Sequence, residues 1–426
     1  MRAQIVTLTL NPAVDLASTA AAVRPTHKIR TFDERLDPGG GGINVARVVH
    51  ALGGDALALI MTGGVTGRLV EELLDEAGVR WHALPIRGRT RISLNVHDRQ
   101  TDLEYRFVPE GPNVEADEWH AVLDILRNVE AEWIVASGSL PRGVPTDFYG
   151  QTAAIAAKRG QKFVLDTSGA ALRAAMGHGL ELLKLSLGEL EFLIDHQLPD
   201  PQSREEAVAS LIGSGAARMI AVSLGPEGAV LGTGDGIRRL PAVPVQERSA
   251  VGAGDSFLAG LVLGLARGMS QRDALAFGVA AGAAAVATYG TAQVRPGDIE
   301  VLYRQARGGA ETSDHPPSPL IASDRSESVS VDTIETAHQV ADLLHQRGHV
   351  RQAALLSGVL LERRAAAALL TALREACQTV LTAAEAIDPV SAAMVEELRL
   401  QVDTRIKQLR DRRVDNSTTS AQVVRS

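Results

Sequence analysis

The regular alternation of strand and helix signals between residues 132 and 223 restricts the fold more than any other feature of the chain. Short apolar runs predict strands, and apolar residues at helical spacing predict the segments between them. Such alternation produces βαβ units, with parallel strands and helices on both faces of the sheet. We therefore expect a doubly wound, mostly parallel α/β sheet, with strands at 132–136, 162–166, 181–185 and 217–223 and helices at 146–159, 170–177, 188–195 and 203–213.

The preceding and following residues carry the same kinds of signal. They predict strands at 3–10 and 56–61, an edge hairpin within 227–246, and helices at 43–52, 68–77, 116–130 and 271–288. Residues 89–97 and 103–108 instead alternate polar and apolar side chains. Such alternation predicts strands with one face toward water or a ligand.

Composition changes after residue 306, where the α/β pattern ends. Residues 307–330 are rich in Gly, Pro and Ser and predict a linker. Residues 331–412 have helical spacing and no strand signal, which predicts a separate helical extension. Residues 413–426 are polar and are expected to be a disordered tail.

Charge and composition narrow the class of protein. The net charge of −8 argues against nucleic-acid binding through bulk electrostatics. Cys377 is the only cysteine in the chain, so neither an internal disulfide nor a cysteine-based metal site is expected. The chain contains no run of about 18 consecutive apolar residues, so no membrane span is expected. The N-terminus resembles a first strand rather than a signal peptide, so we expect a cytoplasmic protein.

The sequence SAVGAGDS at residues 249–256 is the strongest candidate for chemistry. Small residues permit a tight turn, and the apolar run 257–266 predicts a helix beginning near Asp255. The first N–H groups of a helix have no internal partner and favour an anion, such as a phosphoryl group. Asp255 could take a proton from a hydroxyl group there. The alternative is that Asp255 only caps the helix.

Four consecutive glycines at 39–42, followed by Asn44, predict a loop that a ligand can approach closely. The alternative is a flexible loop with a helix cap. Four residues follow predicted strands and are expected to share one rim of the sheet, where ligands of open α/β sheets bind: Asp15, Ser139, Asp166 and Gly225. Lys28, Arg91 and Arg106 lie on or near the polar strands and could meet a phosphate, although a solvated face is the alternative.

Together these segments resemble a known family. GGGxNxA at 40–46 and VGAGD at 251–255 match the two signatures of the PfkB-type carbohydrate kinases of the ribokinase-like superfamily, although Ala250 stands where Thr is usual. The resemblance covers residues 1–305 and is closest to the minor-type bacterial 6-phosphofructokinases. Further segments that resemble this type are TLTLNPAVD at 7–15, YRFV at 105–108, SGSLP at 137–141, VSLGP at 222–226 and GVAAG at 278–282.

The resemblance implies a kinase domain over 1–306, with a small β lid from 12–37 and 89–108. It implies ATP, Mg²⁺ and a phosphorylated ketohexose as ligands, and a homodimer; the helical extension is free to bind another chain. Fructose 6-phosphate is the expected substrate and fructose 1,6-bisphosphate the product. Alternatives are 1-phosphofructokinase, tagatose-6-phosphate kinase, and a regulatory protein that binds sugar phosphate on a degenerate kinase fold. Gly41 favours the first choice, because the other two kinases usually have Lys there.

The resemblance also implies roles for individual residues. Asp255 is the expected base, and the turn that steadies the phosphoryl group is Gly252, Ala253 and Gly254. The expected sugar-phosphate contacts are Asp15, Lys28, Gly40, Gly41, Asn44, Arg91, Arg106 and Ser139. The expected ATP contacts are Lys184, Ser186, Ser223, Leu224, Gly225, Pro226, Glu227 and Gly228. Glu189 is expected to hold Mg²⁺ through water, and a monovalent cation such as K⁺ is assigned to Ser249, Val251, Ala285 and Gly290.

One segment departs from the family. An Asn-x-x-Glu motif organises Mg²⁺ in its members, and here Ser186 replaces the Asn while Glu189 is retained. Gly188 stands where close relatives carry a Lys near the ATP phosphates. This departure motivates the regulatory alternative, whereas the retention of Asp255 in a glycine turn argues for turnover.

Overall fold

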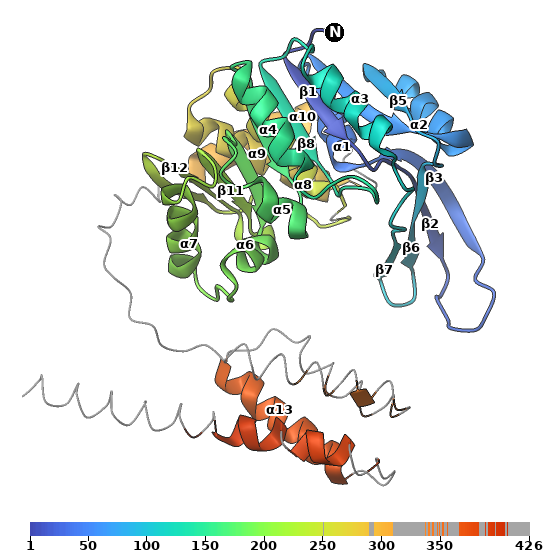
Figure 1. Ribbon diagram of the computed structural model, residues 1–426, viewed down its shortest axis with the longest axis vertical. Helices are drawn as coiled ribbons and strands as arrows, with labels where there is room; N and C mark the ends of the chain where they lie inside the picture. The colour runs from blue at the N-terminus through green and yellow to red at the C-terminus, as the bar shows by residue number, and fades with distance from the viewer. Residues whose placement is uncertain are drawn as a thin grey trace, which may run out of the picture. The chain divides into compact units, whose positions relative to one another are not determined.

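The computed structural model describes residues 1–249, 251–288 and 294–309, together with part of the C-terminal region. The described C-terminal positions are 337, 340, 343, 344, 347, 349, 352, 356, 366–382, 388, 391–396, 398–404 and 407. The chain forms two compact units, Met1–Ser318 and Pro319–Ser426 (Figure 1). None of the helices in these described segments is long and apolar enough to cross a membrane.

The first unit is built on a nine-stranded sheet in the order β13-β12-β11-β10-β9-β8-β1-β4-β5. The seven strands from β11 to β5 are parallel, and β12 and β13 add an antiparallel edge. This confirms the mostly parallel α/β sheet. Its strands are β1 (Ile5–Thr9), β4 (Ala56–Thr62), β5 (Trp81–Pro85), β8 (Trp133–Ser137), β9 (Lys162–Asp166), β10 (Leu182–Ser186), β11 (Met219–Ser223), β12 (Ala229–Thr233) and β13 (Gly236–Leu240).

Helices cover both faces of this sheet, so its central strands are buried on both sides. In β8, Trp133 and Val135 pack into one core, whereas Ile134 and Ala136 pack into the other. The first core is completed by α1 (Gly41–Ala51), α2 (Gly64–Glu76), α8 (Ala253–Ala266), α9 (Gln271–Val286) and α10 (Pro296–Gly309). The second is completed by α3 (Ala116–Leu126), α4 (Phe148–Lys158), α5 (Gly169–Ala175), α6 (Leu187–Ile194) and α7 (Pro201–Gly213).

The structure adds one strand to the sequence predictions and moves the start of the predicted linker. The edge strand β5 was not predicted, because its alternating WHALP sequence lacks the apolar run of the central strands. The predicted linker begins too early, since residues 307–309 belong to α10. There Arg307 forms an ion pair of 2.9 Å with Asp273 of α9, which holds the end of α10 on the first unit. The remaining linker residues, 310–330, lie outside the described residues.

A second sheet of four strands, in the order β3-β2-β6-β7, projects from the main body (Figure 1). It consists of β2 (Ala13–Ala20), β3 (Thr31–Gly39), β6 (Arg91–Asp98) and β7 (Leu103–Phe107). Asp15 pairs with Ser93 on a polar face, and Leu16 pairs with Leu94 on the opposite, apolar face. The strands predicted from alternation at 89–97 and 103–108 are therefore confirmed.

The second unit is helical in its described part, which confirms the expected helical extension. Its longest described helix is α13 (Ala366–Thr382), and Cys377 and Val380 of this helix are buried. They pack with buried aliphatic residues from other described positions, such as Leu344 and Leu398. The predicted tail at 413–426 lies outside the described residues.

Glycines permit the close packing of α8 on α9. A Cβ atom on Gly260 would lie 2.8 Å from the carbonyl oxygen of Phe277, and one on Gly278 would lie 2.9 Å from that of Phe257. Both distances are shorter than van der Waals contact. The predicted small-residue helix at 271–288 therefore packs on α8 as expected, and it ends at Val286.

We expect Gly260→Ala to destabilise the first unit by about 1–3 kcal/mol, because the added methyl group overpacks the helix interface. The matched control is Gly213→Ala in α7, where the new Cβ meets no atom within 4 Å. This control should stabilise by about 0.5 kcal/mol. Urea unfolding monitored by tryptophan fluorescence reports on this unit, since all three tryptophans precede residue 134. Equal midpoints for the two variants would contradict the packing explanation.

Candidate active site

The turn before α8 has the conformation that its glycines permit. Gly252 is left-handed, with φ 79° and ψ 3°, and α8 begins at Ala253, so Asp255 lies in its first turn. A Cβ on Gly254 would lie 3.0 Å from the Lys184 Nζ, so glycine leaves room for this ammonium group beside the helix start. An anion at this turn would meet both a positive side chain and open backbone N–H groups.

Asp255 is held by two neutral side chains. Its Oδ2 accepts a hydrogen bond of 2.8 Å from Asn44 Nδ2, and Ser137 Oγ lies 3.4 Å from its Oδ1. Burial raises the pKa of Asp255 to about 6; the charge of Asp166 adds to this effect, and the Asn44 bond and Lys184 oppose it. A carboxylate with this pKa is deprotonated near neutral pH and still basic enough to accept a proton. This geometry fits a base as well as a helix-terminal residue.

The glycine loop and the α8 turn meet although they are far apart in the sequence. Gly40 has φ 122°, which only glycine adopts readily, and α1 starts directly after it. A Cβ on Gly41 would lie 2.1 Å from Ser137 Oγ and 3.1 Å from the nearer Asp255 oxygen. The loop predicted to approach a ligand therefore passes close to the candidate base.

Asp166 and Ser137 belong to this cluster, and the sequence predictions gave neither a chemical role. Asp166 ends β9 and binds Lys184 Nζ through both carboxylate oxygens at 3.2 Å, with both side chains almost buried. Ser137 ends β8 and donates to Asp166 at 3.3 Å. The sequence did contain a signal for both residues: each is polar and ends an apolar strand, and the ends of parallel strands form the ligand-binding edge of the sheet.

Lys184, an expected ATP contact, also acts electrostatically on the candidate base Asp255. Burial lowers its pKa, but the carboxylates of Asp166, Asp255 and Glu189 outweigh burial and raise the pKa above its ordinary value. Lys184 is therefore a permanent positive charge beside the α8 turn.

Asp15 differs from the rim prediction. It does not directly follow a strand of the main sheet but lies within β2, on the polar face of the second sheet. Burial raises its pKa to about 6, and Asp37 adds to this, whereas Arg106, Arg91 and Arg47 lower it. Gly39 makes room for its carboxylate, since a Cβ there would lie 2.3 Å from Asp15 Cγ.

The basic residues predicted to bind phosphate have unlike surroundings. Arg91 donates to the carbonyl oxygens of Pro109 at 2.7 Å and Asn11 at 2.8 Å, so backbone groups orient its guanidinium. Arg106 is exposed on β7 and close enough to lower the pKa of Asp15. Lys28 is exposed in the connection between β2 and β3. Ser139 accepts a hydrogen bond of 3.3 Å from Asn11.

The predicted nucleotide turn is a short 3₁₀ segment, Gly225–Glu227, directly after β11. Gly225 and Gly228 both have positive φ, at 58° and 100°, which explains the two glycines. The buried Arg204 of α7 binds Glu227 at 2.7 Å, so Glu227 has a structural partner. At its start, Ser223 pairs with Ser186 in the sheet, which brings two predicted ATP contacts side by side.

The candidate metal residue Glu189 caps its own helix. Its Oε2 accepts bonds from the Ser186 backbone N–H at 2.7 Å and the Ser186 hydroxyl at 2.8 Å. Mg²⁺ keeps several waters and needs only one or two carboxylates besides substrate phosphates. Asp166 and Glu189, which both act on Lys184, fit that donor set. Within the described residues no group of three or more His, Cys, Asp or Glu side chains forms a protein-only metal cage.

The residues assigned to a monovalent cation are only partly described. Ser249 Oγ accepts from the Val251 N–H at 3.3 Å, and the Ala285 carbonyl accepts from the Thr288 hydroxyl at 3.0 Å. Gly290 lies outside the described residues.

Comparisons with known proteins agree with this geometry. Residues 8–296 match the family described as pfkB family carbohydrate kinase. The chain is 42% identical over 305 residues to ATP-dependent 6-phosphofructokinase isozyme 2 of Mycobacterium tuberculosis, covering 71% of this chain and 90% of that protein. Phosphofructokinase-2 from Escherichia coli in complex with potassium aligns with a TM-score of 0.69 and 36% identity, covering 72% of this chain and 99% of that chain. The same protein with fructose-6-phosphate aligns at 0.68 and 35%, with the same coverage.

We expect activity that depends on Asp255 to fall as the pH drops through about 6, because protonation removes the base. Asp166→Asn removes the like charge that raises this pKa, so the acid limb of the kcat/KM profile should move to lower pH. Asp117→Asn is the control, since Asp117 pairs with Arg87 on the surface. An acid limb shifted equally in both variants, or in neither, would contradict the assigned coupling.

Proposed function

The chain belongs to the pfkB family of carbohydrate kinases, and from this we propose that it phosphorylates fructose 6-phosphate with ATP to give fructose 1,6-bisphosphate. It is an ATP-dependent sugar-phosphate kinase of the phosphofructokinase type. The choice of fructose 6-phosphate is the proposal. The observation that carries it is the tight packing at Gly41, where an added Cβ would lie 2.1 Å from Ser137 Oγ. This loop therefore has no room for the lysine that is usual in the alternative kinases.

In the proposed reaction the C1 hydroxyl of the sugar loses its proton to Asp255. Asn44 orients the carboxylate by its 2.8 Å bond and leaves the other oxygen directed to Ser137 and the incoming hydroxyl. The N–H groups around Gly252 and Gly254, together with Lys184, neutralise negative charge on the transferring phosphoryl group. Phosphoryl transfer depends mainly on such positioning and charge neutralisation. Bound Mg²⁺ would add neutralisation of the phosphate charge at Asp166 and Glu189.

The polar face of the second sheet supplies the other side of the proposed sugar site. Asp15 would accept a hydrogen bond from a sugar hydroxyl, and Gly40 and Gly41 would allow the sugar to approach the backbone closely. Arg91 and Arg106 both act electrostatically on Asp15, which supports their proposed role toward the 6-phosphate. Arginine suits this role because its planar donors bind phosphate oxygens in pairs. Lys28 remains a proposed additional contact from the exposed connection, and Ser139 one from the end of β8.

The nucleotide would lie along the carboxyl ends of β10 and β11. Lys184 and Ser186 come from one strand, and the turn from Ser223 to Gly228 comes from the next. Leu224 is buried beneath this turn, and the Arg204–Glu227 pair fixes its position. The potassium complex of the E. coli relative supports a monovalent cation near Ser249 and Ala285.

We expect wild-type protein to release ADP with fructose 6-phosphate at a kcat/KM at least tenfold above that with fructose 1-phosphate or tagatose 6-phosphate. Asp255→Asn should lower kcat by about 10²–10⁴-fold, since it removes the base. Calorimetry should show fructose 6-phosphate binding retained. A preference for another hexose phosphate would overturn the substrate, and a kcat within tenfold of wild type would remove Asp255 as the base. Binding without any turnover would favour the regulatory alternative.

We also propose a homodimer through the apolar face of the second sheet. Leu36, Ile92 and Phe107 lie on this face and are 41%, 46% and 57% exposed. The opposite face carries Asp15 and its arginines, so the apolar face is not needed by the proposed sugar site. Contiguous exposed apolar residues on a sheet are typical of a protein interface, and a second copy offers a matching surface.

Phe107→Glu should therefore shift the protein from dimer to monomer in sedimentation equilibrium. Val301→Glu is the control, because Val301 is 51% exposed on α10, a helix that packs on α9. A monomeric wild type, or a Phe107→Glu variant that stays dimeric, would contradict this interface.

The Ser186 cap predicts an unusual metal requirement. Because the Ser186 hydroxyl and N–H both hold Glu189 Oε2, this carboxylate is drawn toward its own helix. Asn reaches farther and presents an amide oxygen together with two N–H donors. A lysine at 188 would meet no obstacle, since a Cβ there has no atom within 4 Å.

We expect Ser186→Asn combined with Gly188→Lys to lower the Mg²⁺ concentration needed for half-maximal rate by about threefold or more. Gly188→Ala is the control, because it changes the backbone without adding charge. The two substitutions are neighbours, so their effects should not simply add. An unchanged Mg²⁺ titration in the double variant would show that Ser186 and Gly188 do not limit metal use.

A further inference from the structure

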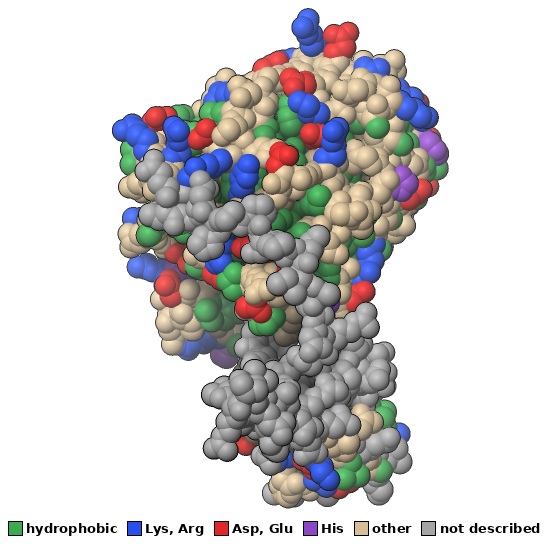
Figure 2. Space-filling view, turned by 90° about the vertical axis from the view of Figure 1, so that its left-hand side faces the viewer, with side chains coloured by type: hydrophobic (Ala, Val, Ile, Leu, Met, Phe, Trp, Pro, Cys, Tyr) green, Lys and Arg blue, Asp and Glu red, His purple; other side chains and the backbone are tan. Residues whose placement is uncertain are grey.

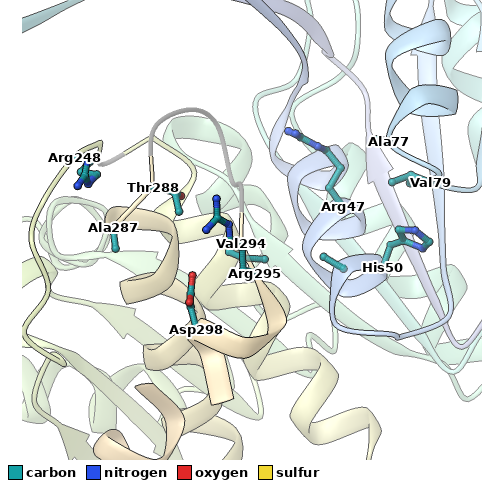
Figure 3. A pocket seen from close by; sticks show the side chains of 11 residues that line it. Arg47, His50, Ala77, Val79, Arg248, Ala287, Thr288, Val294, Arg295 and Asp298 are labelled. Atoms are coloured by element: carbon teal, nitrogen blue, oxygen red, sulfur yellow. The ribbon is translucent and has the colours of Figure 1, made fainter. Parts of the chain in front are cut away.

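A cationic cleft lies outside the site described above. It has a volume of about 660 Å³ and runs between α1 and the start of α10. Figure 3 shows Arg47 and His50 on one side, and Arg248, Arg295 and Asp298 on the other. The volume is in the range of small-ligand sites. No role assigned above uses His50, Arg248, Arg295 or Asp298.

The charges of the lining favour an anion. Among the described residues that line the cleft, three are arginines and one, Asp298, is acidic. On the face of this unit that Figure 2 shows, basic and acidic side chains are interspersed. A guanidinium group can bind two phosphate oxygens at once through two parallel N–H donors. Here the arginines come from separate segments of the chain and line the same cleft. The chemistry of the lining therefore fits a small phosphate-bearing anion.

Arg47 connects this cleft to the proposed sugar site. Its Nη2 lies 3.3 Å from an oxygen of the buried Asp37, which Arg35 also binds at 2.7 Å. Asp37 pairs in register with Asp15 across β3 and β2. The charges of Asp37 and Arg47 both act on Asp15. An anion that contacts Arg47 would compete with Asp37 for this guanidinium.

We propose that the cleft is an effector site for a small phosphate-bearing anion, which weakens sugar-phosphate binding by drawing Arg47 away from Asp37. The site itself goes beyond the proposed function. Its effect on the sugar rests on that function, because it acts through Asp15.

The binding half is tested without turnover. Full-length protein is saturated with fructose 6-phosphate and a non-hydrolysable ATP analogue, and inorganic phosphate is titrated by calorimetry. Wild type should bind one phosphate per chain, and Arg295→Ala should bind it about tenfold more weakly, the usual loss for one charge-assisted contact. Arg304→Ala is the matched control, since Arg304 lies on the same helix but outside the cleft lining. Absence of binding, or equal binding by both variants, would overturn the site.

The coupling half is tested by kinetics. Phosphate should raise the KM for fructose 6-phosphate about threefold more in wild type and Arg304→Ala than in Arg295→Ala, with kcat unchanged. Without phosphate, Arg295→Ala should have wild-type activity. An equal rise of KM in all three proteins would mean competition at the sugar site and would overturn the coupling. If the protein does not phosphorylate fructose 6-phosphate in the absence of inorganic phosphate, the proposed function is contradicted. The effector site would still be supported in that case, provided that Arg295→Ala weakens phosphate binding.

Discussion

The hydrogen bond from Asn44 to Asp255 is the contact on which the candidate site depends. It joins the first turn of α1 to the first turn of α8, whose residues are separated by 211 positions. Gly41 is the first residue of α1, and Gly252 directly precedes α8. A Cβ on Gly41 would lie 2.1 Å from Ser137 Oγ, so no side chain fits between these two residues. The approach of the two helix starts brings open backbone N–H groups and the candidate base into one space. A larger residue at either turn would separate them.

The charges around Lys184 explain why this space suits a nucleotide with a divalent cation. One ammonium group faces three carboxylates, those of Asp166, Asp255 and Glu189. Burying charges is costly unless they are paired, and one lysine cannot neutralise three acids. Burial raises the pKa of Asp255, the negative charge of Asp166 adds to this effect, and a bound cation would reduce it. The same cluster thus maintains a usable base and favours a metal ion.

In the proposed function the second sheet has two roles, because side chains alternate along a strand. In β6, Arg91 and Ser93 belong to the face of Asp15, whereas Ile92 and Leu94 belong to the opposite face. One set can contact a sugar phosphate while the other contacts a second chain. Arg47 extends the polar face toward the α1–α10 cleft through Asp37, so three surfaces depend on the same short strands.

The sequence by itself determined the parallel α/β sheet, the glycine turns and the family, because these depend on local periodicity and on motifs within short segments. It identified Asp255 and Asn44 separately, and the tertiary structure showed that they are bonded. It noted Asp166 at the rim but gave neither Asp166 nor Ser137 a role, since a polar residue at a strand end acquires meaning only from its neighbours. It placed Asp15 both at the rim of the main sheet and within the predicted lid, and the structure puts it in β2 of the second sheet, because chain order alone does not reveal where a short strand pairs. The pKa values of Asp15 and Asp255 and the capping of Glu189 by Ser186 were likewise decided by tertiary structure, since burial and contact geometry are properties of the packed molecule.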